Sequence, residues 1–408
     1  MKIAIIGAGA AGLMAAITAK RLNKNLNIDI FDNNKGIGKK ILASGNGRCN
    51  ISNTIITEAN YIGENADFVT YALNEFDFKA FEKFCKSVGL ILDIKDTSKV
   101  YPLSNEAKSV VNLLEAAISS LGINLHLQTK IIDIEKTDGK FNIKSEDSEF
   151  NNYDKTLISC GLGAAPQLNA TEIGVDLAAK FEHSSNITYP SLVGLHTNFD
   201  QNSRVQGVKK EAAVSLYIDG SKHCEIFGDV LFTKYGVSGF AILDISQYAS
   251  YHLSYYQDVQ IAVNLFPNKN KNELLGTIES MFKSLPEQSA SLLLTGIVSN
   301  KLASILLDVS KINKDAKAKD VNSKQIRSLV NNLVNWRFKI TDTQGFKHAE
   351  ASGGGVRTEE VDHRTYESKK CKDLYFAGEV LDIVGNRGGF NLHFAWASGY
   401  LAGKSLVK

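Results

Sequence analysis

The sequence predicts an α/β protein in which a largely parallel sheet is built from both ends of the chain, with two further segments inserted between them. Residues 3–31 contain a short apolar run, a glycine-rich turn, a longer apolar run and a second short one, which is the order of a βαβ unit. Residues 373–379 form another apolar run that ends in glycine and an acid. Between these regions the pattern changes from strand-like to helical and polar, so we expect more than one domain in 408 residues.

The composition is ordinary for a globular protein, with 44% hydrophobic and 22% charged residues. The formal net charge of +2 gives no electrostatic reason to expect nucleic acid or an anionic membrane as the main partner, so a small molecule is the expected partner. The five cysteines are odd in number and scattered, which favours neither a metal site nor a disulfide framework. A reduced, cytoplasmic location fits this pattern, and nothing in it indicates the oligomeric state.

The first βαβ unit is expected to comprise a buried strand at residues 3–6, a helix at 13–22 and a second strand at 27–31. The turn between the first strand and the helix reads Gly7-Ala8-Gly9-Ala10-Ala11-Gly12, which is the pattern G-x-G-x-x-G. Alone this pattern is a weak signal, but here it follows a strand, opens a helix and is followed by an acid at the end of the next strand. The sequence therefore predicts a Rossmann-like dinucleotide-binding domain.

Each position of this fingerprint has a physical task. Gly7 permits the tight turn, Gly9 lets a pyrophosphate approach the backbone, and Gly12 allows close packing of helix and strand. Asp32 can accept hydrogen bonds from ribose hydroxyls, and the helix N-terminus supplies unpaired N–H groups to the phosphates. The residues expected to contact a dinucleotide here are Gly7, Gly9, Ala10, Ala11, Gly12 and Asp32.

The next part of the chain alternates helical and strand-like patterns. Amphipathic helices are expected at residues 76–88 and 106–121, separated by strand and loop at 91–101. Short strand-like runs then follow from residue 123 to residue 160, and we interpret them, including 125–127, as a β-meander that returns the chain to the sheet at 156–160.

The middle of the chain predicts an insertion. Residues 190–267 contain several strand-like runs, and residues 268–336 are helical and polar. From residue 338 onward the chain returns to strands and glycine turns, and it closes with a helix from about residue 392 to residue 405.

The apolar run Asp373 to Glu379 favours FAD over NAD as the expected dinucleotide. It resembles the second FAD fingerprint of the glutathione-reductase-like superfamily, in which the acid contacts the ribityl chain. The resemblance implies that Gly378 and Glu379 bind FAD. A simple NAD dehydrogenase has no need of a second fingerprint that brings this part of the chain back to the N-terminal fold.

Longer motifs narrow the resemblance to one bacterial family. Residues 40–50 read Lys-Ile-Leu-Ala-Ser-Gly-Asn-Gly-Arg-Cys-Asn, which resembles a signature of the YhiN-like and BaiN-like FAD-dependent oxidoreductases, a group that includes a bile-acid 4,6-reductase. Residues 231–239, 378–382 and 388–399 are similar to that family's other motifs. The resemblance implies an FAD domain with an inserted β-barrel and a helical subdomain. Further FAD contacts implied by it are Lys40, Ser44, Gly45, Asn46, Gly161, Gly389, Phe390, Asn391 and Leu392.

With this resemblance the expected domains are an FAD-binding domain at 1–189 and 345–408, a β-barrel-like insert at 190–267 and 335–344, and a helical subdomain at 268–334. Two departures from the family stand in the insert: Lys234 occupies the position of a histidine, and Phe240 that of a proline. Gly161-x-Gly163 also follows a strand, but no G-x-x-G completes it, so a second dinucleotide site is not expected. NAD(P)H remains open as a diffusible electron donor.

The predicted function is an FAD-dependent oxidoreductase that transfers a hydride between flavin N5 and a small organic substrate. The resemblance favours reduction of a carbon–carbon double bond conjugated to a carbonyl. Arg48 is the candidate for a fixed charge near the flavin or substrate, and Cys49 is a weaker catalytic candidate because no base stands beside it in the sequence. No metal site is expected. Two alternatives stay open: a flavin-dependent RNA-modifying enzyme, and a flavin-binding regulatory protein without turnover.

Overall fold

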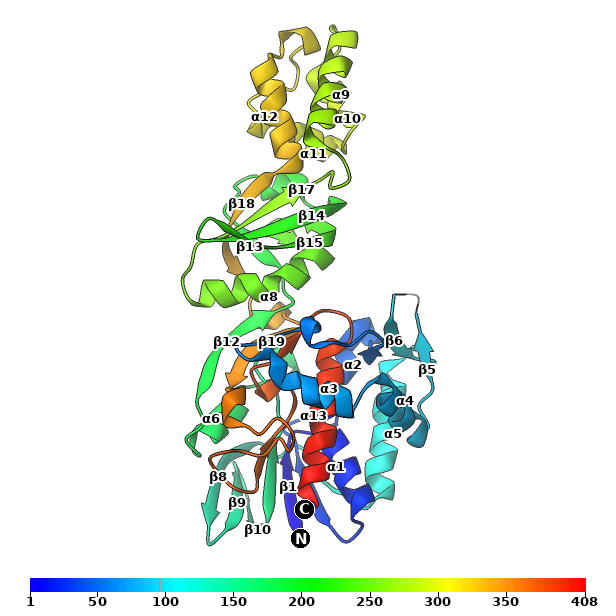
Figure 1. Ribbon diagram of the computed structural model, residues 1–408, viewed down its shortest axis with the longest axis vertical. Coiled ribbons are helices and arrows are strands. Elements are labelled where there is room, and N and C mark those ends of the chain that lie inside the picture. Colours follow the sequence, from blue (N-terminus) through cyan, green and yellow to red (C-terminus); the bar gives the residue numbers. More distant parts are fainter. Residues whose placement is uncertain (96) are drawn as a thin grey trace. The chain divides into compact units, whose positions relative to one another are not determined.

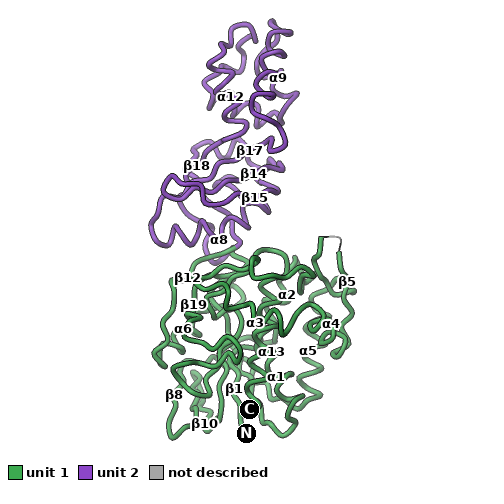
Figure 2. Tube along the Cα trace, viewed as in Figure 1, with its two compact units in different colours: residues 1–191, 349–408 green, residues 192–348 purple. Residues whose placement is uncertain are grey.

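The computed structural model describes residues 1–95 and 97–408 (Figure 1). The chain divides into two compact units, shown in Figure 2. Unit 1 comprises Met1–Ser191 and Ala349–Lys408, and unit 2 comprises Leu192–His348. The sheet domain is thus assembled from segments on both sides of an insertion. The division of the insertion into separate barrel and helical domains stays a prediction.

Unit 1 is centred on a parallel sheet with the strand order β20-β11-β1-β2-β7. Its strands are β1 (Lys2–Ile6), β2 (Asn27–Phe31), β7 (Asn124–His126), β11 (Lys155–Ile158) and β20 (Leu374–Phe376). All four strand pairs are parallel. Residues 3–6 of β1 and all of β11 are buried, as expected for a parallel sheet that is covered on both faces. This sheet confirms the predicted α/β, Rossmann-like class.

The β-meander is shorter than the sequence suggested. It contains β8 (Ile131–Thr137), β9 (Lys140–Ser145) and β10 (Glu149–Tyr153), which pair antiparallel. The run at 125–127, which we expected in the meander, instead forms β7 at the edge of the parallel sheet, where Leu125 lies opposite Ile30. A strand of three residues carries too little pattern to reveal which sheet it joins.

The helices of unit 1 are α1 (Ala10–Leu22), α2 (Lys39–Ala43), α3 (Val69–Glu75), α4 (Phe78–Ser87), α5 (Ala107–Ser120), α6 (Ile173–Ala179) and α13 (Phe390–Leu406). The single helix expected at 76–88 is wrong at its start. Phe76 ends α3 in a non-helical conformation, and the Asp77 side chain caps α4 by accepting a hydrogen bond from the Ala80 N–H at 2.8 Å. Asp77 is therefore a helix N-cap rather than a residue within a helix.

Helices α1 and α13 pack closely although they come from distant parts of the sequence. Added Cβ atoms on Gly399 and Gly403 of α13 would overlap backbone atoms of Ala11 and Ala15 in α1. Only glycine lets the two backbones approach to this distance. The N-terminal end of α1 is thus held by a helix that begins at Phe390.

Three small sheets of short strands complete unit 1. β3 (Ser52–Asn53) and β5 (Leu92–Ile94) flank β6 (Lys99–Pro102), β4 (Tyr61–Ile62) pairs with β21 (Val384–Gly385), and β12 (Ser185–Ser191) pairs with β19 (Ala351–Val356). All these pairs are antiparallel.

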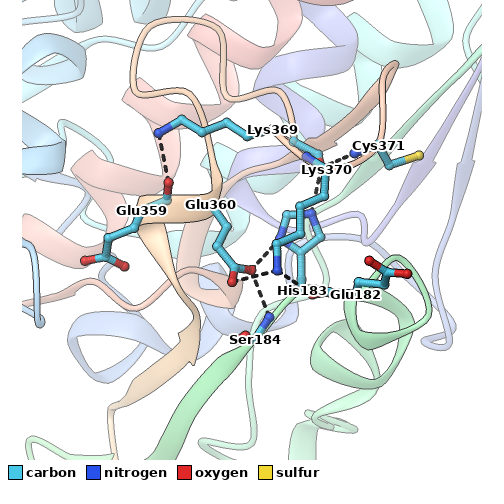
Figure 3. Close-up of polar contacts among 9 residues, drawn as sticks. Glu182, His183, Ser184, Glu359, Glu360, Lys369, Lys370 and Cys371 are labelled. Atoms are coloured by element: carbon cyan, nitrogen blue, oxygen red, sulfur yellow. Dashed lines mark hydrogen bonds and ion pairs between the residues drawn. The ribbon is translucent and has the colours of Figure 1, made fainter.

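A buried histidine ties the loop at 357–371 to the start of β12 (Figure 3). The Ser368 hydroxyl accepts hydrogen bonds from the N–H groups of Lys370 and Cys371, and its oxygen is hydrogen-bonded to Nε2 of His183 at 2.6 Å. The other ring nitrogen of His183 lies 3.2 Å from Oε2 of Glu360, which also pairs with Lys370 at 2.8 Å. Burial lowers the pKa of His183, so its neutral form is favoured and the cluster acts as a structural clamp.

Unit 2 contains a closed barrel with the strand order β13-β16-β15-β14-β17-β18. Its strands are β13 (Leu195–Thr197), β14 (Lys209–Ile218), β15 (Ser221–Phe232), β16 (Gly236–Ser238), β17 (Val259–Asn264) and β18 (Trp336–Thr343). The barrel implied by the family resemblance is thus present. Helices α9 (Lys271–Ser284), α10 (Ala290–Thr295), α11 (Asn300–Val309) and α12 (Ser323–Val334) lie together at one end of this unit (Figure 1).

Two helices of unit 2 lie where strands and loops were expected. They are α7 (Asn202–Val205) and α8 (Phe240–Ser254). Polar residues such as Ser246, Gln247 and Ser250 are buried on α8, so apolar periodicity does not reveal this helix in the sequence.

Candidate cofactor site

Two glycines of the first fingerprint are required by the packing of the protein itself. Gly7 has a φ of +106°, and a Cβ there would lie 2.6 Å from the backbone oxygen of Ser159. A Cβ on Gly12 would overlap the backbone oxygen of Gly7 and stand 2.7 Å from Ser159 Oγ. Neither position tolerates a side chain, so these two glycines fix the turn between β1 and α1.

Gly9 differs, because a Cβ on it would meet no atom within 4 Å. Its φ of −85° is accessible to any residue. The first hydrogen bond within α1 runs from the Leu13 N–H to the Gly9 carbonyl at 3.0 Å, so the N–H groups of the preceding residues point out of the helix end. The protein alone does not explain a glycine here, and the open space beside a helix N-terminus suits a phosphate.

Asp32 follows β2 and is held by two backbone donors. Its Oδ2 accepts a hydrogen bond from the Ala8 N–H, and its Oδ1 accepts one from the Asn34 N–H, both at 2.8 Å. These bonds fix the carboxylate beside the glycine turn. Each carboxylate oxygen keeps a further lone pair that can accept a hydrogen bond from a ribose hydroxyl.

Three distant segments meet at Glu379. Its Oε1 accepts a hydrogen bond from the Ser352 N–H at 2.8 Å, and its Oε2 forms an ion pair with the ammonium group of Lys40. Gly161, with a φ of +71°, lies so close that a Cβ would be 3.2 Å from Glu379 Oε2. The structure therefore brings together Lys40, Gly161 and Glu379, which the sequence analysis selected separately.

Other segments of the protein pack against the N-terminus of α13 and leave no open space at Gly389. Gly389 has a φ of +96°, and a Cβ on it would overlap the Ser52 carbonyl oxygen. The Asn53 side chain donates to the Gly388 carbonyl at 3.0 Å. Asn391 exchanges two hydrogen bonds with the backbone of Gly385, at 2.7 and 2.8 Å. The helix end is thus fixed against β3 and the segment before α13.

His393 reinforces this junction from inside the protein. Its Nε2–H donates to the Phe76 carbonyl at 3.0 Å, and its Nδ1 lies 2.9 Å from Ser52 Oγ, which donates to it. Burial lowers the pKa of His393 to about 4. The ring is therefore neutral at pH 7. Sequence reasoning did not select His393, Ser52 or Ser352, because each is recognised only through a partner that is distant in the sequence.

Compared with known proteins, the chain matches the HI0933-like protein Rossmann domain over residues 1–405. The chain belongs to this family. A 3-dehydro-bile acid delta(4,6)-reductase of Clostridium scindens is 31% identical over 407 residues, 100% of this chain and 99% of that protein. A ribosomal RNA dihydrouridine synthase of Haemophilus influenzae is 29% identical over 411 residues, 99% of this chain and 98% of that protein.

Among solved structures, the 3-ketosteroid-delta4-(5alpha)-dehydrogenase from Rhodococcus jostii RHA1, in complex with 4-androstene-3,17-dione, is similar with a TM-score of 0.50 at 12% identity. The similarity covers 100% of this chain and 97% of that chain, and it shows the fold alone. The HI0933-like family and the two fingerprints identify an FAD-dependent oxidoreductase. The open space at Gly9 and the fixed carboxylate of Asp32 fit this cofactor.

The two catalytic candidates occupy different environments. The Arg48 side chain is exposed, donates from Nε to the Gly45 carbonyl at 3.3 Å and lies 5.6 Å from the Tyr101 ring. Cys49 is fully buried, and burial raises the pKa of its thiol to about 11. A thiol with this pKa stays protonated at pH 7, which argues for packing rather than nucleophilic attack.

The remaining predicted contacts surround the same region. Ser44 donates to the Ile41 carbonyl at 2.8 Å, and Gly45 and Asn46 have positive φ values of 57° and 55°. The Phe390 carbonyl accepts a hydrogen bond from the Tyr61 hydroxyl at 3.1 Å, and Leu392 is half-buried. In the part of the chain that the structure describes, no group of His, Cys, Asp or Glu side chains could hold a metal ion. No helix among those residues is long and apolar enough to cross a membrane.

Proposed function

We propose that this oxidoreductase reduces a carbon–carbon double bond conjugated to a carbonyl group of a small organic molecule. The proposal rests on the reactions named for two relatives, each of which aligns with nearly the whole chain. One is named for reduction of a 3-dehydro-bile acid and the other for synthesis of dihydrouridine. Their substrates differ, but both reactions saturate a double bond conjugated to a carbonyl.

The flavin would supply a hydride to the carbon β to the carbonyl. The adjacent α carbon then takes a proton, and negative charge develops on the carbonyl oxygen before that proton arrives. Arg48 is exposed on the segment after α2 and offers a planar guanidinium that can orient this oxygen and stabilise its charge. Cys49 would pack behind the segment, because its thiol stays protonated.

The FAD contacts extend from α1 to α13. The pyrophosphate would lie at Gly9, Ala10 and Ala11, with the adenosine ribose at Asp32 and the ribityl chain near Lys40, Gly161 and Glu379. Residues 44–46 and 389–392 would border the ring. Support comes from the convergence of these segments within unit 1. NAD(P)H would be a diffusible electron donor, and the setting would be the cytoplasm.

The test is anaerobic single turnover of the reduced protein with a panel of conjugated enones, including 3-oxo-4-ene steroids. Oxidation of the flavin by an enone, but not by its saturated analogue, is expected. Arg48→Lys should slow this step at least about tenfold while FAD stays bound. Arg327→Lys, on an exposed face of α12, is the matched control and should behave as wild type. Failure of every enone to oxidise the flavin would refute the proposal.

A second candidate is reduction of uridine in RNA, and a charge pattern favours it. Residues 301–339 carry nine lysines and arginines but only three acidic residues, although the whole chain has a net charge of only +2. These residues belong to unit 2, where they include helices α11 and α12. A basic segment of this kind can bind a phosphate backbone.

Retention of a ribosomal RNA transcript at several salt concentrations separates the two candidates. Binding that weakens steeply with salt, together with dihydrouridine formation, would identify RNA as the substrate. Reversing charge at Lys311 and Lys314 should then weaken binding, whereas reversal at Lys83 and Lys86 in unit 1 should not. Salt-independent, weak RNA retention with turnover of enones would identify the small-molecule reaction. Flavin reduction without turnover of either substrate would favour the regulatory alternative.

A further inference from the structure

A cavity of about 660 Å³ lies within unit 2 and is lined by two segments of the chain, residues 207–210 and 295–302. The first segment leads from the loop after α7 into β14, and the second leads from the last residue of α10 into α11. This volume is within the range of small-molecule sites, about 300–1,000 Å³. None of the residues predicted to contact FAD is among the lining residues. The cavity therefore has room for a ligand other than FAD.

The lining of this cavity is basic. Lys209, Lys210 and Lys301 contribute to it, and no aspartate or glutamate is among the lining residues in the described chain. Lys209 forms an ion pair with Asp229, with 2.7 Å between Nζ and Oδ2, so its charge is balanced by a carboxylate outside the lining. Two lysines, one on β14 and one on α11, are left to set the charge of the cavity.

These two lysines have no carboxylate partner in the part of the chain that the structure describes. The ammonium group of Lys210 lies 5.2 Å from the centroid of the Phe266 ring. That of Lys301 donates to the Gln206 carbonyl at 2.8 Å. A ring face and a carbonyl group are both uncharged, so neither neutralises an ammonium group, and each ammonium keeps N–H donors for a ligand. The cavity thus offers positive charge from two different elements.

The N-terminus of α11 adds backbone donors to the same lining. Its N-cap residue, Ser299, makes no capping hydrogen bond with its side chain. The first bond of this ten-residue helix runs from the Ala303 N–H to the Ser299 carbonyl at 2.8 Å, so the N–H groups of residues 300–302 have no partner within the helix. Residues 300–302 all line the cavity. Backbone N–H groups and two ammonium groups therefore serve one space, and such a donor set suits an anion.

A phosphate group fits these donors better than a carboxylate, because its oxygens are arranged tetrahedrally and accept hydrogen bonds from several directions. A phosphate ion alone would leave most of the cavity unfilled, and Val208, Ile297 and Val298 give the lining an apolar part. We propose that the cavity binds the phosphate group of a nucleotide, with Lys210 and Lys301 on the phosphate and the apolar part against the nucleoside. The nucleotide can be a free mononucleotide or one unit of an RNA chain, since both present the same phosphate chemistry.

The experiment titrates the FAD-saturated protein with 5′-AMP and, separately, with a short oligouridylate, by isothermal calorimetry. Lys210→Ala and Lys301→Ala should each weaken binding about tenfold, because each removes a charged donor to the phosphate. Ser299→Asp should weaken binding at least as much, because its carboxylate would bond the same N–H groups and repel the phosphate. Aspartate is a good N-cap residue, so this variant should unfold at the same temperature as wild type or higher. Lys283→Ala, on the exposed end of α9 and outside the lining, is the matched control and should bind as wild type does.

Loss of AMP binding in all three variants would support the proposal and identify a free nucleotide as the ligand. The same loss for the oligouridylate, without binding of AMP, would support it and assign the phosphate to RNA. Adenosine bound as tightly as AMP would overturn it, because the phosphate would then contribute nothing. Absence of binding by both probes up to about 1 mM would also overturn it, as would wild-type binding by the three variants. If the lysine variants do not fold, Ser299→Asp decides alone.

Discussion

Helices α1 and α13 both begin after a glycine in unit 1, but the two glycines are there for opposite reasons. At Gly9 a side chain would meet nothing within 4 Å, whereas at Gly389 it would overlap the Ser52 carbonyl oxygen. The first helix end is open and complements a ligand, and the second is closed by the protein. The comparison teaches that a glycine is evidence for a ligand in its own right only where the packing of the protein does not already require it.

Gly389→Ala should produce the largest effect. The left-handed φ of +96° and the overlap with Ser52 together predict a loss of about 3–5 kcal/mol in the free energy of unfolding. Denaturant unfolding of the apoprotein measures it. Gly47→Ala is the control, since Gly47 also has a positive φ of 81° but no atom within 4 Å, and it should cost about 1 kcal/mol. Equal stabilities for the two variants would remove the steric argument for Gly389.

The closed end also predicts a pH dependence. His393 has a pKa of about 4 in the folded protein against 6.5 for an ordinary histidine, so between these values the unfolded chain binds a proton that the folded chain does not. The contribution of His393 to stability should therefore fall by about 3 kcal/mol as pH drops from 6.5 to 4 and level off below that. Unfolding in urea at pH 7, 6, 5 and 4 tests this. His393→Gln should flatten the slope, leaving the smaller contributions of His183 and His223, whose pKa values are also lowered by burial.

At the open N-terminus of α1, a substitution should weaken FAD binding rather than lower the stability of the protein. Gly9→Ala should leave the stability of the apoprotein within about 0.5 kcal/mol of wild type, since the added methyl group meets no atom within 4 Å. FAD binding should weaken by about 2–3 kcal/mol because the pyrophosphate loses its approach to the backbone. Isothermal titration of apoprotein with FAD provides the measurement. A variant that binds FAD normally would mean that the pyrophosphate lies elsewhere.

Glu379→Ala should have a similar or smaller effect on the cofactor. If this acid hydrogen-bonds the ribityl chain, its loss weakens FAD retention by about 1–3 kcal/mol. The exposed Glu359 gives the matched control, and Glu359→Ala should change binding by less than about 0.5 kcal/mol. Equal FAD dissociation constants for the two variants would exclude a ribityl contact at Glu379.

The smallest expected effect concerns Cys49. Because burial raises the pKa of its thiol to about 11, iodoacetamide at pH 8 should leave Cys49 unmodified in the folded protein. The partly exposed Cys371 serves as an internal reference for labelling. Mass spectrometry of digested protein distinguishes the two sites. Rapid alkylation of Cys49 would restore it as a catalytic candidate.

The sequence predicted those parts that depend on local pattern. Residues 27–31 form a strand within the predicted limits, and residues 107–120 a helix, because their apolar periodicities are clear. The fingerprint at residues 7–12 likewise follows from fixed spacing. The sequence did not reveal that β7 joins the parallel sheet, because the pairing of a three-residue strand is decided by distant neighbours.

The site was predictable to the same extent. Lys40, Gly161 and Glu379 were selected from separate motifs, and the structure brings them together. The Ser352 N–H that holds Glu379 and the ring of His393 were missed. Each of these groups acquires its meaning from a partner on another element, so no spacing within the sequence marks it.

The order of strands in the parallel sheet has a consequence for the newly made protein. Strand β1 leaves the ribosome first, but β20, which begins at Leu374, and α13, which covers α1, follow only after the whole insertion has been translated. At about 5–20 residues per second, this interval is on the order of tens of seconds. During that time the first fingerprint is present without the strand and helix that complete its surroundings. Cofactor loading is therefore expected to be one of the last events in the biogenesis of this enzyme, because a chain interrupted before β20 would lack Glu379 and the whole of α13.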